Sequence, residues 1–191
     1  MAADTDRLEL WISQAKGGNL GAFQELYDHF ARKVFNFIYR MIASSEEAED
    51  LTQDTFIMVY RKLGTLKDNS RFEPWLFRIA RNFVYQRYRR RPPPMVSVDD
   101  QDEAGRAAAE LVDERKNPQE VFQAEELEQR VQQVILGLQE KYREVFILSA
   151  IHHLSYQKIA EIVGRSLPSV KTDIHRARLQ VRNQVKEYLK G

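Results

Sequence analysis

The chain has 191 residues, enough for one medium domain or two small ones, and 43% of them are hydrophobic. It contains no cysteine, which excludes disulfide bonds and any zinc site or nucleophile built on cysteine. The net charge is only +1, but residues 71–91 carry seven Arg and one Glu, residues 95–126 carry ten acids and three bases, and residues 165–191 carry seven bases and two acids. The small net charge therefore conceals two basic segments on either side of an acidic one.

Sequence features of membrane insertion and of catalysis are missing. No stretch approaches the roughly 18 apolar residues that a membrane span needs, and the N-terminal residues lack the apolar segment of a signal peptide. The four histidines show no ligand spacing with carboxylates, and there is no glycine-rich phosphate loop. We therefore expect a cytoplasmic protein without membrane insertion, with no metal or other cofactor, and with no enzymatic activity of its own.

Apolar residues recur every three or four positions almost throughout, which predicts an all-α fold. We expect a first helix from about Leu20 to Ile42. A second helix should begin after the N-cap Ser44, where Glu47 would complete a capping box, and Gly64 should end it. Its expected buried face is formed by Ala48, Leu51, Thr55, Val59 and Leu63.

A third helix is expected to start near Pro74, since proline is well tolerated in a first turn. At about 100° per residue, one arc is expected to face the core; it contains Phe72, Leu76, Ile79, Ala80 and Phe83. The opposite, exposed side should carry Phe77, Arg78, Arg81, Tyr85, Tyr88 and Arg89. Exposed rings beside arginines are typical of surfaces that stack bases and follow the phosphates of single-stranded nucleic acid. The alternative is a solvated basic helix with tyrosines lying along it.

Three prolines after Arg91 forbid continuation of this helix, and the residues that follow are acidic, small and free of aromatics. A helix should resume at Pro118, because Asn117 can act as its N-cap. The sequence thus predicts two small helical domains, residues 1–92 and 118–191, joined by an acidic flexible linker, residues 93–117.

The stretch "LSYQKIAEIVGRSLPSVKTDIHRARLQVR" predicts a helix-turn-helix. Ser155 and Ser166 can cap its two helices, and Gly164 can adopt the turn between them. With Val170, Ile174, Ala177 and Val181 buried, the second helix would expose residues suited to duplex DNA. The base-edge candidates are Lys171, Thr172, His175 and Arg176, and the remaining DNA-binding candidates are Arg165, Ser169, Arg178 and Arg182. We expect Asp173 to be a local salt-bridge partner. The alternative is an ordinary helical hairpin with a cationic surface.

Five stretches together resemble the bacterial RNA polymerase sigma factors of the extracytoplasmic-function (ECF) group in the sigma-70 family. They are "AFQELYDHF", "EEAEDLTQDTFIMVYRKL", "FEPWLFRIARN", "LQEKYREVFIL" and "LSYQKIAEIVGRSLPSVKTDIHRAR". The resemblance implies a region 2 domain at residues 1–92 and a region 4 domain at residues 118–191. It also implies a linker that passes through the polymerase cleft.

The resemblance further implies partners and site residues. Core RNA polymerase would be bound through the coiled coil of its β′ subunit and through other subunits, with Glu49, Asp50, Gln53 and Asp54 facing the coiled coil. A loop would capture an extruded base of the minus-ten element of promoter DNA; it comprises Lys67, Asp68, Asn69, Ser70 and Arg71. The melted strand would be held by Arg78, Arg81, Asn82, Tyr85 and Tyr88. The helix-turn-helix would read the minus-thirty-five element as duplex, and an anti-sigma factor is expected as a further partner.

Two other classes of function are alternatives to a sigma factor, a DNA-binding regulator and an enzyme. A DNA-binding repressor or activator acting without core polymerase would explain the helix-turn-helix. It would not explain the aromatic and basic helix upstream or the acidic face on the helix before it. An enzyme is the third class, and the residues offer no constellation for it.

Overall fold

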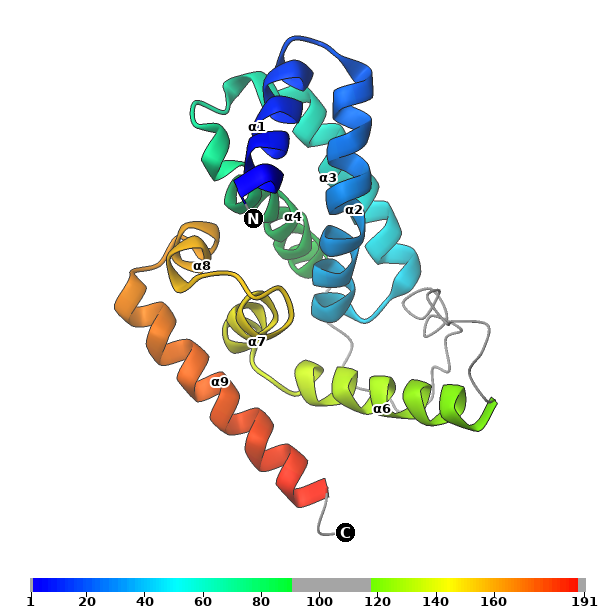
Figure 1. The fold of residues 1–191 in the computed structure, drawn as a ribbon. Helices are drawn as coiled ribbons and strands as arrows, with labels where there is room; N and C mark the ends of the chain where they lie inside the picture. The colour runs from blue at the N-terminus through cyan, green and yellow to red at the C-terminus, as the bar shows by residue number, and fades with distance from the viewer. Residues whose placement is uncertain (1, 91–117, 189–191) are drawn as a thin grey trace.

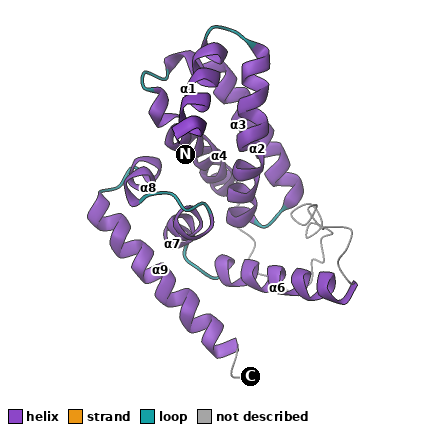
Figure 2. Cartoon of the chain, viewed as in Figure 1, coloured by secondary structure: helices purple, strands orange, loops and turns teal. Residues whose placement is uncertain are grey.

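The computed structural model describes residues 2–90 and 118–188, and every regular element in these two ranges is helical (Figures 1 and 2). The first range contains α1 (Ala2–Lys16), α2 (Leu20–Ile42), α3 (Ser45–Lys62) and α4 (Phe72–Arg90), with the 3-10 turns η1 (Leu63–Thr65) and η2 (Asn69–Arg71) between α3 and α4. The second contains α6 (Pro118–Leu136), α7 (Glu140–Phe146), the π-helical turn η3 (Ile147–Ile151), α8 (Tyr156–Val163) and α9 (Leu167–Tyr188). The all-α prediction is confirmed. The predicted linker, residues 93–117, lies outside the described residues.

Polar side chains fix the ends of α2 and α3 largely as the sequence indicates. Asn19 caps α2 by accepting a hydrogen bond from the Ala22 amide at 3.1 Å. Ser44 caps α3 by accepting from the Glu47 amide at 3.3 Å. The Glu47 carboxylate is bound by Arg87 of α4, so the second half of the expected capping box is replaced by a contact between helices.

The end of α3 differs from the expectation. Gly64 was predicted to end the helix, but α3 ends at Lys62 and Gly64 lies within η1; among the described glycines only Gly18 and Gly164 have positive φ. The chain passes from α3 directly into η1, and the Leu66 amide donates to the Leu63 carbonyl. Leu63 and Leu66 are both buried. Burial of these two leucines, rather than a glycine cap, therefore sets the path of the chain here.

Helix α1 was not predicted. Its apolar side chains recur at helical spacing, and they are Leu8, Trp11, Ile12 and Ala15. Ile12 is fully buried and Ala15 is 9% exposed in the same core as α2. Such a short stripe was the only signal available in the sequence, and tertiary contact with α2 and with the turns η1 and η2 stabilises the helix.

The buried face of α4 is wider than the sequence suggested. Phe77 and Tyr88, which were predicted to be exposed, are 0% and 8% exposed, and Val84 is also buried. Ile79 and Phe83, which were predicted to be core, are only half-buried. The physical reason is that α4 contacts α8 as well as α2 and α3, so a second side of the helix is covered. A single core arc was the wrong assumption for a helix with neighbours on two sides.

The two halves share one hydrophobic core. Phe37 of α2 and Phe77 of α4 pack edge to face with ring centroids 5.6 Å apart. His152, which follows η3, lies against both, 6.3 Å from Phe37 and 5.1 Å from Phe77. Figure 1 shows α7 and α8 beside the α1–α4 bundle, with α9 extending away from it. The helix-turn-helix is thereby held against the first helical half.

Arg143 of α7 secures this arrangement at the end of α2. Its buried guanidinium donates to the Met41 carbonyl at 2.8 Å and to the Leu138 carbonyl at 3.1 Å. The Tyr88 hydroxyl donates to the same Met41 carbonyl at 2.6 Å. The last carbonyls of a helix lack partners within it, so a cation and a hydroxyl from other elements satisfy one of them here. Tyr88 thus has a structural role in this conformation.

Candidate nucleic-acid interface

The loop between α3 and α4 presents short polar side chains on a fixed backbone. The Asp68 carboxylate accepts from the Ser70 amide at 3.0 Å and from the Ser70 hydroxyl at 2.6 Å, and these two bonds lower the pKa of Asp68. Lys67, Asp68, Ser70 and Arg71 are exposed, and Asn69 is half-buried. The five residues predicted for base capture therefore form one small, accessible, hydrogen-bonded surface.

On α4, Arg81 and Tyr85 lie together and face α7. The Arg81 guanidinium lies over the Tyr85 ring, 4.4 Å from its centroid, and also pairs with the Glu144 carboxylate. The Tyr85 hydroxyl donates to Glu144 Oε2 at 3.1 Å. Burial first, and then the negative charge of Glu144, raise the pKa of Tyr85, so its hydroxyl stays protonated and remains a donor. The sequence predicted that this cation and this ring share an exposed face, but in the structure both are half-buried and contact a carboxylate of the other half.

Glu144 connects the two basic regions of the chain. Its side chain is 1% exposed and lies 3.5 Å from Arg165, in the turn of the helix-turn-helix, in addition to its contacts with Arg81 and Tyr85. Burial raises the pKa of Glu144, while the charges of Arg81 and Arg165 oppose that shift. An acid inside the apolar run "YREVFIL" was the available sequence signal, because a buried carboxylate requires a cationic or hydrogen-bonding partner. The sequence alone could not say which residues those partners are.

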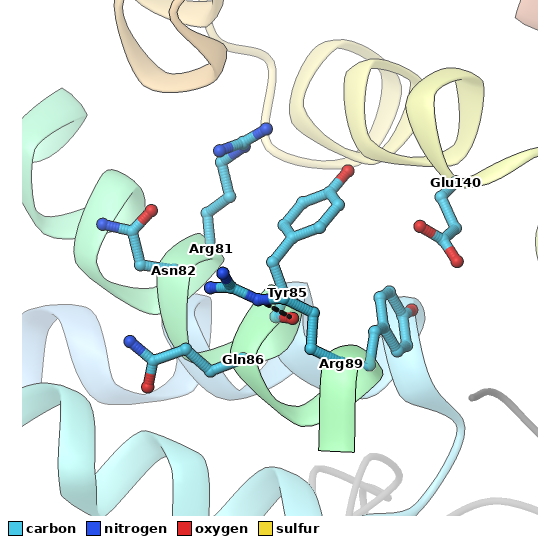
Figure 3. A pocket seen from close by; sticks show the side chains of 7 residues that line it. Arg81, Asn82, Tyr85, Gln86, Arg89 and Glu140 are labelled. Atoms are coloured by element: carbon cyan, nitrogen blue, oxygen red, sulfur yellow. Dashed lines mark hydrogen bonds between the residues drawn. The ribbon is translucent and has the colours of Figure 1, made fainter. Parts of the chain in front are cut away.

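A groove of about 800 Å³ lies along the C-terminal half of α4 (Figure 3). Its lining residues are Arg81, Asn82, Tyr85, Gln86, Tyr88, Arg89 and Glu140. In Figure 3 the Tyr85 ring points towards α7, and Glu140 stands across the groove from α4. Arg89 donates to the Tyr85 carbonyl at 3.4 Å, which holds its side chain along the helix. The groove combines arginines, amides and an aromatic edge, which are the groups that contact single-stranded nucleic acid.

Two ion pairs near the surface extend the contact between the halves. Arg71 of the loop donates to Glu161 of α8 through Nε at 3.0 Å and Nη2 at 2.8 Å. Lys158 of α8 pairs with Glu73 of α4 at 2.6 Å. Because Arg71 is 59% exposed, its pair contributes at most about 1 kcal/mol. These pairs affect the relative orientation of the two halves more than the stability of the fold. Arg71, one of the residues predicted for base capture, is engaged in the first of them.

The predicted helix-turn-helix is confirmed as a structure. Ser155 caps α8 through the Lys158 amide at 3.3 Å, and Gly164 ends that helix in the left-handed conformation with φ 67°. The Ser166 hydroxyl accepts from the Ser169 amide at 3.4 Å, which caps α9. The buried face of α9 contains Val170, Ile174 and Ala177, with Val181 half-buried. The two helices are therefore set as the spacing of the sequence indicated.

The outward face of α9 carries the predicted duplex-reading side chains. The exposed members are Lys171, Thr172, His175, Arg176, Arg178 and Arg182, and Ser169 is half-buried. The Thr172 hydroxyl donates to the Pro168 carbonyl at 3.1 Å, so its methyl group is the part left for a base edge. Arg176 lies near the Tyr142 hydroxyl, 3.4 Å from it. Arg165 pairs with Asp173 at 2.6 Å, which confirms Asp173 as a local salt-bridge partner.

The four polar residues predicted for core-polymerase binding lie on the outward side of α3. Glu49, Asp50, Gln53 and Asp54 are all exposed, as expected. Beside them is a groove of about 340 Å³ between α2 and α3, lined by Tyr27, Ala31, Arg32, Phe35, Glu49, Thr52 and Gln53. The α2 residues of this groove were not among the predicted contacts. Phe35 and Tyr39 of α2 stack in parallel, with ring centroids 6.0 Å apart.

The described part of the chain offers no sign of metal or membrane chemistry. It contains no group of three or more His, Asp or Glu side chains placed to hold a metal ion. Among the described helices, none is long and apolar enough to cross a membrane.

Comparison with known proteins gives two family matches along the chain. Residues 26–92 match Sigma-70 region 2, and residues 128–181 match Sigma-70, region 4. The chain is 34% identical over 180 residues to the ECF RNA polymerase sigma factor SigW of Bacillus subtilis, covering 92% of this chain and 95% of that protein. It is 30% identical over 186 residues to the ECF RNA polymerase sigma-E factor of Escherichia coli, covering 95% and 96%.

Solved structures share the fold. CnrH, in complex with the cytosolic domain of CnrY, superposes with a TM-score of 0.70 at 24% identity, over 95% of this chain and 99% of that one. The sigma factor RpoE of Bartonella quintana, in complex with the anti-sigma factor NepR, gives a TM-score of 0.63 at 22% identity, over 86% and 96%. At these identities the likeness concerns the fold alone.

Proposed function

This chain belongs to the ECF group of RNA polymerase sigma factors, and we propose that it binds core RNA polymerase and directs initiation at specific promoters. In this proposal residues 1–92 form the region 2 domain and residues 118–191 form the region 4 domain. The first domain binds the polymerase and captures the melted minus-ten strand. The second reads the minus-thirty-five element as duplex DNA.

The observation that carries the proposal is the presence of two different DNA-binding chemistries on one chain. The outward face of α9 offers cations, a histidine and a threonine methyl on a helix that a major groove can accept. The loop before α4 and the groove on α4 offer instead short polar groups, an arginine over a ring, and amides. A repressor that binds only duplex DNA has no use for the second surface.

The capture loop supports a base-extruding role by its chemistry. Extruding a base costs a few kcal/mol, so the loop must return hydrogen bonds from groups that are already in place. The bonds from Ser70 to Asp68 hold the loop in one conformation before DNA arrives. Arg78 and Asn82, both exposed on α4, extend the surface along the path of the strand.

Engagement of the melted strand requires the two halves to separate. Arg81, Tyr85 and Arg71 bind Glu144 and Glu161 in the conformation described above. Phosphates would take the place of these carboxylates, because arginine pairs with either anion in the same bidentate geometry. We therefore assign this conformation to the free sigma factor and a more open one to the polymerase-bound form.

Core-polymerase binding is proposed for the outward side of α3. Glu49, Asp50, Gln53 and Asp54 form an exposed polar strip there, next to the groove between α2 and α3. An acidic strip is suited to the basic side chains of a coiled coil, and Tyr27 and Phe35 supply apolar contact area beside it. An anti-sigma factor is proposed as a further partner, by analogy with RpoE, which has a similar fold and is in complex with the anti-sigma factor NepR.

The test adds the purified chain to core RNA polymerase with a random-sequence promoter library and sequences the transcripts. We expect transcripts that share two promoter elements. A double variant, D50K and D54K, should lose core binding in a pull-down, while E9K, which reverses an exposed acid on α1, should retain it. Sequence-specific duplex binding without any association with core polymerase would overturn the proposal in favour of a repressor.

A further inference from the structure

Lys16, the last residue of α1, reaches across to the loop that precedes α4. Its ammonium group donates to the Leu66 carbonyl at 2.6 Å and to Asn69 Oδ1 at 2.5 Å. These two acceptors stand on either side of Lys67 and Asp68 in the chain. One cation therefore closes the loop at both ends, and the helix that supplies it lies outside the segment that matches Sigma-70 region 2, residues 26–92.

The contact with Asn69 has a chemical consequence. A carboxamide offers an acceptor on one side and two donors on the other, whereas an ammonium group can only donate. Lys16 therefore fixes the Oδ1 side of Asn69 towards itself and turns the Nδ2 side away. Among the described residues no protein group accepts a hydrogen bond from Asn69 Nδ2, so its donors are free to meet a ligand.

The rest of the loop holds this donor in place. Leu66 is 8% exposed and anchors one end in the core. The Asn69 carbonyl accepts from the Phe72 amide, which ties the other end to the first turn of α4. The Asp68 and Ser70 bonds fix the tip between them. Asn69 is thus presented with a defined side and on a rigid support.

We propose that Lys16 is a positioning residue that sets the base preference of the capture loop. By holding Asn69 Oδ1, it selects Nδ2 as the group offered to the extruded base, and so favours a base that turns an acceptor towards Asn69. This inference rests on the proposed function of the loop. It adds a specificity determinant on α1, which lies far from the capture loop in the amino-acid sequence.

A purely structural role for Lys16 makes a different prediction. If Lys16 only attached α1 to the loop, its loss would lower stability and activity at all promoters equally. If it orients Asn69, its loss releases the amide to rotate, and discrimination at one promoter position should fall while the other positions keep their preference. The variant N69D gives an independent check, because an aspartate keeps the contact with Lys16 but presents an acceptor where the amide presented a donor.

The experiment reconstitutes holoenzyme from core polymerase and the full chain, and scores transcripts from a library randomised over the minus-ten element. For the wild type we expect about tenfold discrimination at the captured position, as for one good base contact. K16M should reduce it to within about twofold there and leave other positions unchanged, K16R should restore most of it, and N69D should favour a different base. K62M, which removes an exposed lysine at the end of α3, is the matched control and should behave as the wild type.

The outcomes separate this inference from the proposed function. If the wild type yields no promoter-specific transcripts, the proposed function fails. If the wild type does so but K16M keeps its full preference at every position, the role of Lys16 is overturned. Circular dichroism of K16M checks that it folds. Should it not fold, N69D decides, and an unchanged preference in N69D overturns the inference.

Discussion

The Tyr85 hydroxyl donates a hydrogen bond to the buried Glu144 carboxylate at 3.1 Å, and this bond joins α4 of the first half to α7 of the second. Arg81 pairs with the same carboxylate, and Arg165 of the helix-turn-helix lies 3.5 Å from it. The groups proposed to hold single-stranded DNA thus bind an anion that belongs to the chain itself. Glu144 occupies, in chemical terms, the place that a phosphate would take.

Replacing Glu144 by glutamine should open this contact. Glutamine keeps the shape and can still accept from Tyr85, but it removes the charge that pairs with Arg81 and Arg165. We expect the free chain carrying E144Q to bind a single-stranded oligonucleotide with the minus-ten sequence about five- to tenfold more tightly, consistent with loss of about 1 kcal/mol of coupling between the halves. Fluorescence anisotropy with a labelled oligonucleotide measures this directly.

The matched control for this prediction is E140Q. Glu140 lines the same groove from α7 but makes no ion pair with Arg81 in the described structure. Its neutralisation should change the affinity by no more than about twofold, because Glu140 is only half-buried and its charge is largely screened by solvent. Equal gains in E140Q and E144Q would mean that general loss of negative charge, and not release of Arg81 and Tyr85, explains the effect.

Tyr85 and Tyr88 should respond differently to substitution, although the sequence places both on one helix face. Y85A removes a ring from the groove and should impair promoter opening while leaving the closed complex and the fold largely intact. Y88A removes a ring that is 8% exposed and should lower the free energy of unfolding by about 3 kcal/mol or more. Permanganate footprinting measures opening, and urea denaturation measures stability.

The conservative variant Y88F separates the two roles of Tyr88. It keeps the ring and loses the bond to the Met41 carbonyl, which Arg143 still satisfies at 2.8 Å, together with the weaker bond that the hydroxyl accepts from Arg143 at 3.4 Å. We expect a loss of about 1 kcal/mol in stability and normal promoter opening. Impaired opening in Y88F with unchanged stability would restore Tyr88 to the DNA-binding set.

The sequence predicted the features that depend on local chemistry and missed those that depend on tertiary contact. A helix cap depends only on hydrogen bonds to residues a few positions away in the sequence. The caps formed by Ser44, Ser155 and Gly164 were therefore predicted correctly. The exposure of Tyr88 was predicted wrongly because helical periodicity does not reveal that Met41 of α2 and Arg143 of α7 lie against its hydroxyl.

Long-range pairs had no signal in the chain. Lys16 meets the loop 50 and 53 residues away, and Arg81 meets Glu144 63 residues away. A lysine at a helix end and an arginine on a basic helix are ordinary surface residues until their partners are known. The candidate site was therefore predictable as a set of DNA-facing side chains, but not as a set already bound to carboxylates and anchored by α1.

The outward face of α9 should divide into residues that specify sequence and residues that supply affinity. K171A should cost about 1–3 kcal/mol on the preferred minus-thirty-five element and relax the preference at one base pair. R182A should weaken binding to all sequences alike and reduce the slope of log affinity against log salt by about one. Competition binding of holoenzyme to a duplex library at several salt concentrations measures both. A uniform loss of affinity in K171A would reassign that residue to the phosphates.

His152 should make the contact between the halves sensitive to acid. Burial between Phe37 and Phe77 lowers the pKa of His152 to about 4, and the positive charges of Lys33, His153 and Arg40 act in the same direction. The unfolded chain takes up the proton near pH 6.5 and the folded chain does not, so the stability contributed by neutral His152 is complete above pH 6.5 and is lost as the pH falls towards 4. Between pH 7 and pH 5 the loss should reach about 2 kcal/mol.

The variant H152F tests this prediction because it keeps an aromatic ring and removes the titration. The free energy of unfolding, measured in urea at pH 7, 6 and 5, should fall less steeply in H152F than in the wild type, while carboxylate titrations common to both proteins cancel in the difference. H153N is the control, since His153 is exposed and has a φ of 53° that asparagine tolerates. It should follow the wild-type profile. If the free energy of unfolding fell equally with pH in H152F and in the wild type, protonation of His152 would not destabilise the contact between the halves.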